Sequence, residues 1–201
     1  MSKTLSTPVG LAYYPRIDTP DTKFNSDGVY SCKLHVSEDD YNAFNTKVKD
    51  IVNKAYQDEC QKRGVSKLKL ASTNPVRETD DGKFEIYAKQ VAKKDTRKGL
   101  IEFSITVFDS KGNKIEEVPK VGSDSKLKMG VEIFPYYTDL NGFGYALRLR
   151  AVQILELVEY SSSGSASTFG FTAEEEGYTS NGESFNETFD KDEPLTESAP
   201  F

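Results

Sequence analysis

The chain has 201 residues, which suits one sizeable domain with an appendage or two small domains. Only 36% of the residues are hydrophobic, so part of the chain is not expected to fold. The net charge of −6 is unevenly divided: residues 1–160 hold 25 Lys and Arg against 23 Asp and Glu, whereas residues 161–201 hold one against nine. The negative net charge of the whole chain therefore does not exclude nucleic acid as a ligand of residues 1–160.

The first predicted elements are two strands and a helix. A strand is expected at 9–14, and a second at 29–36, where Cys32 and Leu34 alternate with Lys33 and His35. Ser37 is suited to cap a helix that ends near Gly64. Apolar residues recur every three or four positions between these caps, so the helix should pack on a sheet.

The later segments alternate between apolar and polar residues with the period of a strand. Strands are expected at 84–91, 100–108, 131–137 and 143–158, with turns at Asp109–Asn113 and around Asn141. In the first of them Ile86 and Ala88 should face inward and Tyr87 and Lys89 outward. Short strands with one long helix predict a mainly β chain with the OB-fold, a five-stranded Greek-key barrel.

The composition changes after residue 160, so residues 1–160 are predicted to form the domain and residues 161–201 a flexible acidic tail. The tail opens with a serine-rich linker and then mixes acids with isolated rings, without periodicity. Electrostatically it is similar to a polyphosphate, so we expect it to compete with DNA for a cationic groove and to dock on a partner once displaced. The residues expected to bind that partner are Asp192, Glu193, Glu197 and Phe201.

Catalysis finds little support in the sequence. The single histidine, His35, is predicted on the solvent face of a strand, and no nucleophile or phosphate-loop motif is present. Cys32 and Cys60 match no zinc or redox spacing and are expected to be reduced, packed thiols. We therefore expect no enzyme activity, no catalytic residue, no metal and no cofactor.

Nucleic-acid binding is favoured by cations that alternate with rings. Phosphates attract cations, and unpaired bases stack on flat rings. Cations cluster between residues 83 and 98 around one tyrosine, two arginines share a face of the last strand, and three rings flank the preceding loop. The DNA-binding candidates from this pattern are Lys83, Tyr87, Lys89, Lys93, Lys94, Arg97, Lys98, Tyr136, Tyr137, Phe143, Arg148 and Arg150.

The stretch from Asp109 to Lys128, which reads DSKGNKIEEVPKVGSDSKLK, is followed by Phe134-Pro-Tyr136. It closely resembles a segment of the T7-type phage single-stranded DNA-binding proteins, and the aromatic first strand and the acidic tail closed by phenylalanine also fit. The resemblance implies an OB-fold that binds single-stranded DNA without sequence preference and a possible homodimer. It adds Lys3, Lys111 and Lys114 to the DNA-binding candidates and also supports Tyr136.

The resemblance further implies a role in phage DNA replication and recombination, in the cytoplasm of an infected bacterial cell. The tail of the family contacts the replicative DNA polymerase and the primase-helicase. The Ala-Pro-Phe ending is instead similar to the terminus of bacterial single-stranded DNA-binding proteins, which leaves phage and host partners both open. The rival hypotheses are a protein-interaction module, such as an assembly or regulatory factor acting through the tail, and a nuclease.

Overall fold

The structure is a computed structural model that describes residues 4–97 and 99–159. Lys3, Lys98 and the predicted tail, with Asp192, Glu193, Glu197 and Phe201, lie outside the described residues. The single described helix is α1 (Glu38–Arg63). The described strands are β1 (Thr4–Ser6), β2 (Gly10–Asp21), β3 (Val29–Val36), β4 (Val76–Glu78), β5 (Phe84–Val91), β6 (Lys93–Thr96), β7 (Gly99–Glu102), β8 (Thr106–Phe108), β9 (Lys114–Ile115), β10 (Lys126–Thr138) and β11 (Gly142–Glu156).

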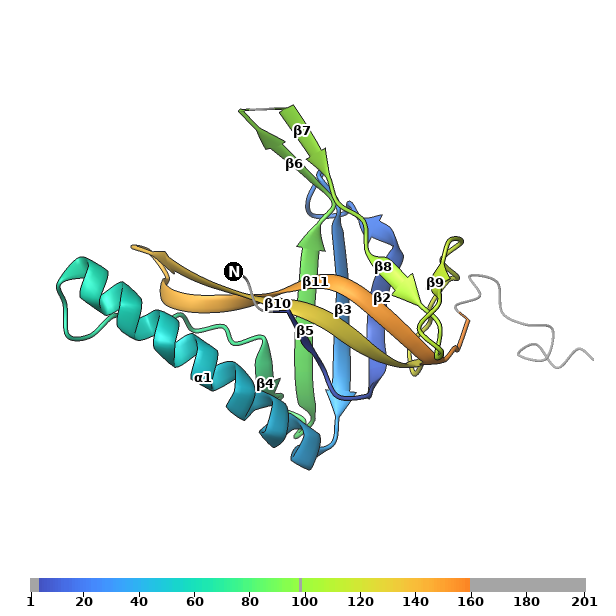
Figure 1. Ribbon diagram of the computed structural model, residues 1–201, viewed down its shortest axis with the longest axis horizontal. Coiled ribbons are helices and arrows are strands. Elements are labelled where there is room, and N and C mark those ends of the chain that lie inside the picture. Colours follow the sequence, from blue (N-terminus) through green and yellow to red (C-terminus); the bar gives the residue numbers. More distant parts are fainter. Residues whose placement is uncertain (1–3, 98, 160–201) are drawn as a thin grey trace, which may run out of the picture. The chain divides into compact units, whose positions relative to one another are not determined.

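A closed ring of strands forms the body of the domain (Figure 1). β2 pairs with β3, and β3 pairs with β5 along its whole length. β5 then meets β11 in parallel at Lys89 and Arg148, β11 pairs with β10, and β10 returns to β2 at Leu11. The ring closes over five strands, and this arrangement is that of the OB-fold. The predicted fold class is confirmed.

The strand alternation that the sequence predicts determines which residues fill the barrel. Leu34, Ile86, Leu147 and Leu149 are fully buried together with residues of β10. Between them, the alternate side chains of β3 and β5 point away from the core. The barrel therefore presents one continuous outer face across β2, β3 and β5.

The helix begins and ends where the sequence predicts. The Ser37 hydroxyl accepts a hydrogen bond from the backbone N–H of Asp40, and Gly64 ends the helix with φ 67°. Phe44 and Val48 join the barrel core, where α1 packs against β5 and β10. Cys60, near the end of the helix, belongs to a second apolar cluster with Leu68 and Phe143.

Two strand predictions are wrong in detail. The predicted strand at 100–108 is divided into β7 and β8, because β7 pairs only with β6 in a separate hairpin and leaves Leu100 and Ile101 exposed. The first predicted strand does not stop at Tyr14, since β2 continues to Asp21 after an irregularity. Tyr14 has a φ of 46°, which bends the strand and lets pairing with β3 resume at Arg16.

Gly142 starts β11 under two constraints, so its replacement by alanine should destabilise the domain. Its φ is +86°, and an added Cβ would lie 2.3 Å from the Lys69 carbonyl oxygen. Gly112 is a matched control because its φ is +85° and nothing lies near its Cβ position. We expect Gly112→Ala to lower the free energy of unfolding by about 1 kcal/mol and Gly142→Ala by about 2–4 kcal/mol in urea titrations. Equal losses would contradict the contact with Lys69.

Candidate nucleic-acid interface

A lysine held between two tyrosine rings occupies the outer face of the barrel. Lys33 on β3 is in register with Tyr13 on β2 and with Tyr87 on β5. Its Nζ atom lies 5.9 Å from the centroid of the Tyr13 ring and 5.8 Å from that of Tyr87. The pairing order across three strands therefore produces a ring, a cation and a second ring in one row.

A row of polar and cationic residues lies beside this first row. Ser31 is in register with Lys89, and Lys89 is in register with Arg148 on β11. Two residues along a strand span roughly 7 Å, so the cations of this row are close to the rings of the first. The guanidinium carbon of Arg148 lies 3.5 Å from the centroid of the Phe134 ring. This ring, on β10, supports the flat guanidinium group by a cation–π contact.

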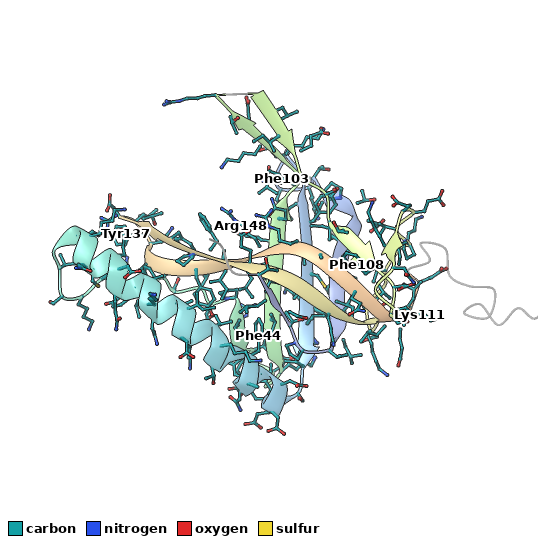
Figure 2. All side chains as sticks on the ribbon, in the orientation of Figure 1. Phe44, Phe103, Phe108, Lys111, Tyr137 and Arg148 are labelled. Atoms are coloured by element: carbon teal, nitrogen blue, oxygen red, sulfur yellow. The ribbon has the colours of Figure 1, made fainter. Side chains whose placement is uncertain are left out.

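A hollow of about 390 Å³ extends this second row toward the β6–β7 hairpin. Figure 2 shows Phe103 at the base of the hairpin and Arg148 on β11. The hollow combines five cations with a ring, two carboxamides, a carboxylate and small apolar surfaces. Its lining residues are Asn25, Asp27, Lys89, Gln90, Val91, Lys93, Lys94, Phe103, Ala146, Arg148 and Arg150.

The cations of the hollow differ in how they are neutralised. Lys93 pairs with Glu102 across the hairpin at 3.2 Å, and Arg150 pairs with Glu132. Within the described part of the chain, Lys89 and Lys94 form no ion pair. These two lysines can therefore be neutralised by a phosphate without breaking an existing pair.

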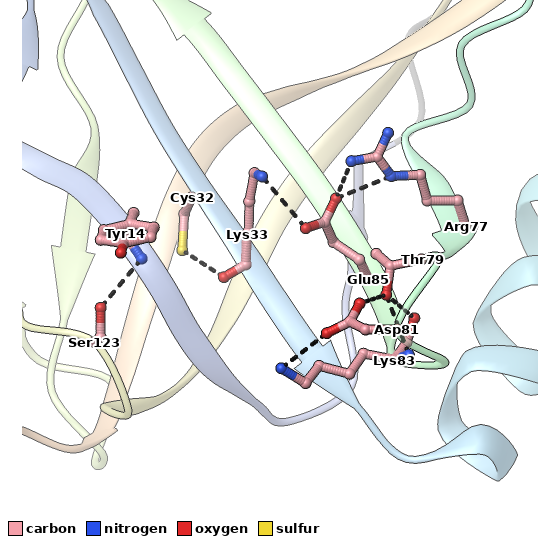
Figure 3. Close-up of polar contacts among 9 residues, drawn as sticks. All are labelled: Tyr14, Cys32, Lys33, Arg77, Thr79, Asp81, Lys83, Glu85 and Ser123. Carbon is pink, nitrogen blue, oxygen red and sulfur yellow. Dashed lines mark hydrogen bonds and ion pairs between the residues drawn. The ribbon is translucent and has the colours of Figure 1, made fainter.

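Lys33 is oriented by a buried carboxylate, as Figure 3 shows. Glu85 is only 2% exposed, and its carboxylate accepts hydrogen bonds from Arg77 at 2.8 Å and pairs with Lys33 at 3.4 Å. The paired arginine compensates the buried charge, so the ammonium of Lys33 is positioned without being fully neutralised.

The two tyrosines beside Lys33 both have raised pKa values. A hydrogen bond with Tyr14 raises the pKa of Tyr13. Burial and, to a smaller extent, the charge of Glu85 raise the pKa of Tyr87. Both phenols therefore stay uncharged at neutral pH.

The β2–β3 loop adds a further exposed ring. Phe24 is 90% exposed, and Lys23 Nζ lies 5.3 Å from the centroid of its ring. In OB-folds the equivalent loop and the adjoining strands form the oligonucleotide-binding surface. Sequence reasoning missed Tyr13, Lys33 and Phe24. The alternation of β3 did place Lys33 on the solvent face, but its neighbours depend on a register that the sequence does not show.

The predicted DNA-binding residues do not form a single surface. Lys89, Lys93, Lys94, Arg148 and Arg150 meet in the hollow, and Tyr87 lies in the adjoining row. Arg97 is exposed at the tip of the β6–β7 hairpin.

Other candidates lie elsewhere on the domain. Lys111 and Lys114 belong to the β8–β9 hairpin, and Figure 2 shows Lys111 apart from Phe103 and Arg148. Lys83 pairs with Asp81 at 3.1 Å in the β4–β5 turn.

The three candidate rings near the β10–β11 turn are placed differently from the prediction. Phe143 is 4% exposed and packs edge-on against Tyr56, so its ring offers no face to a base. Tyr137 is covered by Arg63, whose guanidinium carbon lies 3.6 Å from the ring centroid. The Tyr136 ring packs over Gly144, where its hydroxyl lies 2.7 Å from the position of an added Cβ. These rings pack the β10–β11 hairpin against the second half of α1 and the segment that follows it.

Within residues 4–97 and 99–159, no group of three side chains is arranged to hold a metal ion. None of the helices in that part of the chain has the length and apolar character needed to cross a membrane.

The closed five-stranded barrel, with cations and rings gathered on one outer face, defines a protein of the OB-fold class. Residues 9–157 match the family described as the single-stranded DNA-binding protein of bacteriophage T7. The chain belongs to this family.

Two curated relatives are single-stranded DNA-binding proteins of phages. The chain is 32% identical to that of Escherichia phage T7 over 124 residues, which are 58% of the chain and 52% of the relative. It is 36% identical to that of Enterobacteria phage T3 over 98 residues, which are 48% of the chain and 41% of the relative. The matched region thus spans about half or less of each relative's length.

Solved structures of two phage proteins are similar to this chain. The crystal structure of the single-stranded DNA-binding protein encoded by bacteriophage T7 has a TM-score of 0.69 at 25% identity, covering 89% of this chain and 99% of that one. The single-stranded DNA-binding protein of bacteriophage Enc34, solved in complex with single-stranded DNA, has a TM-score of 0.56 at 13% identity, covering 78% and 88%. The second likeness concerns the fold alone.

Proposed function

We propose that this protein binds single-stranded DNA without marked sequence preference and is not an enzyme. The observation that carries the proposal is the row Tyr13–Lys33–Tyr87 beside the row that contains Lys89 and Arg148. Rings supply stacking surfaces that accept any base, and cations supply contacts to a backbone that is the same for every sequence. Family membership supports the same assignment.

The arrangement favours single strands over duplex DNA. The exposed ring of Tyr13 can stack only on a base whose face is free, and bases in a duplex are already stacked on one another. The cations alone would still attract duplex DNA, because their attraction to phosphate does not depend on strandedness. Discrimination between the two forms should therefore persist at salt concentrations where the electrostatic contribution is weak.

A fluorescence titration with an oligo-dT tests this function directly. We expect saturable binding at about 50 mM salt, weaker binding at about 200 mM, and markedly weaker binding to a duplex of equal length under both conditions. Failure of the oligo-dT to bind at the lower salt concentration, with the tail both present and removed, would refute the proposal.

We further propose that the protein acts in phage DNA replication and recombination, in the cytoplasm of the infected bacterial cell. The tail would recruit partner proteins such as the DNA polymerase and the primase-helicase, and a homodimer is possible. Residues 161–201 hold one basic residue and nine acidic residues, and this charge supports docking of the tail on a partner with a basic surface. The same charge supports competition between the tail and DNA for the cationic face.

Deleting residues 161–201 should tighten DNA binding, because an acidic competitor is lost. Competition between exposed charges is screened by salt, so the gain should be largest at about 50 mM salt and nearly absent at about 500 mM. The measurement is the dissociation constant of oligo-dT for the full chain and the truncated chain at both salt concentrations. Weaker binding by the truncated chain at low salt would contradict the competition.

A further inference from the structure

The hollow beside the second row contains hydrogen-bond acceptors as well as cations. A groove that binds only phosphates would need the cations alone. Asn25, Asp27 and Gln90 line it together with the lysines and arginines. Phosphate oxygens are also acceptors, so they gain nothing from a carboxylate or a carboxamide oxygen. Donors in a single strand are instead found on the edges of the bases.

Asp27 has a fixed backbone and an unneutralised carboxylate. Its carbonyl oxygen accepts a hydrogen bond from the Lys93 N–H at 3.1 Å, and its own N–H donates to the Asn25 side chain at 2.9 Å. Within residues 4–97 and 99–159 its carboxylate forms no ion pair, although the hollow that it lines contains five cations. A carboxylate in that position repels phosphate and attracts an N–H donor.

Gln90 provides a second, independent acceptor. The side chain is 9% exposed, and its Nε2 donates to the Val91 carbonyl oxygen at 3.0 Å. Its Oε1 is buried, and no donor among the described residues reaches it. A buried acceptor without a donor is destabilising, so a rotation of the Gln90 side chain that brings Oε1 to an N–H of a ligand gains a hydrogen bond that the protein alone leaves unmade.

The remaining lining suits a single nucleotide. A volume of about 390 Å³ is enough for one unstacked base with its sugar. Phe103 supplies a ring at the base of the β6–β7 hairpin (Figure 2), and its backbone is held by a hydrogen bond from its N–H to the Ala92 carbonyl oxygen at 2.7 Å. Lys89 and Arg148 supply cations for the adjoining phosphates.

We propose that this hollow binds one unstacked base by its exocyclic amino group. Asp27 and Gln90 accept the hydrogen bonds, and Phe103 stacks on the base. Cytosine and adenine carry such an amino group on their pairing edge, whereas thymine presents a carbonyl oxygen at the same position. The inference rests on the proposed function and adds to it a preference at one nucleotide position in an otherwise sequence-tolerant interface.

Oligonucleotides of thymidine and of 5-methyldeoxycytidine test the preference, because the two bases share a ring and a methyl group. They differ at position 4, which is a carbonyl in thymine and an amino group in cytosine, and at N3, which carries a proton only in thymine. We expect the full chain to bind the 5-methyldeoxycytidine strand about tenfold more tightly at pH 8, as one hydrogen bond to a charged acceptor provides. Asp27→Asn should reduce that ratio to about threefold or less and tighten binding to the thymidine strand. Gln90→Met, which keeps the side-chain length, should also reduce the ratio.

Asp39→Asn, on the first turn of α1, is the charge-matched control and should leave the ratio unchanged. Equal and tight binding of both strands by the unaltered chain would overturn the inference while leaving the proposed function intact. A ratio that survives in both Asp27→Asn and Gln90→Met would also overturn it. Because Asp27 is exposed, its variant remains informative even if Gln90→Met melts at a lower temperature.

Discussion

Replacing Lys89 and Arg148 together with glutamine should weaken binding to oligo-dT by about 10- to 100-fold at 50 mM salt. Both side chains line the hollow and are in register between β5 and β11, so one phosphate backbone can contact both. Each lost phosphate contact also removes about 0.7 from the slope of log K against log salt for a single strand. The slope should therefore fall by about 1.4.

The matched control replaces Lys47 and Lys54, two exposed cations of α1, with glutamine. Net charge changes by the same amount in both double variants, so a general electrostatic effect would weaken binding equally in the two. We expect the helix variant to keep the slope within about 0.3 of the unaltered chain. Equal slopes for all three proteins would place the DNA on another surface. Thermal melting checks that Arg148→Gln, which removes the contact with Phe134, leaves the barrel folded.

The local structure of this chain could be predicted because it depends on neighbouring residues. Ser37 and Gly64 delimit α1 by capping chemistry, and the alternation of β5 places Lys89 outside and Ile86 inside. The same reasoning found all five cations that line the hollow, since they lie at outward-facing strand positions or in the β6–β7 hairpin.

The missing parts of the interface depend on pairing between distant segments. Tyr13 becomes a binding candidate only because β2 is in register with Lys33, and nothing in residues 9–14 shows that register. Phe143 alternates in phase with the buried Leu147 and Leu149, so the strand pattern itself indicates burial. The ring against which it packs, that of Tyr56 on α1, depends on a contact between distant segments. Leu100 and Ile101 have a strand pattern but lie in a hairpin apart from the barrel sheet.

Tyr13 should contribute through its ring and not through charge. Tyr13 is 37% exposed and its ring borders Lys33 and His35, so Tyr13→Leu removes a stacking surface while leaving an apolar side chain on the strand. Loss of one base–ring stack costs about 1–3 kcal/mol, which is about a 5- to 150-fold weaker dissociation constant for oligo-dT. Tyr13→Phe keeps the ring and should bind within about twofold of the unaltered chain.

Salt separates this effect from that of the cations. No phosphate contact is lost in Tyr13→Leu, so log K should fall by the same amount at 50 and at 200 mM salt, and the slope should stay unchanged. The Lys89 and Arg148 variant should instead approach the unaltered chain as salt rises. A reduced slope for Tyr13→Leu would mean that the substitution moves Lys33, whose Nζ lies 5.9 Å from the centroid of the Tyr13 ring. Weak binding by Tyr13→Phe as well would assign the contribution to the Tyr13 hydroxyl in place of stacking.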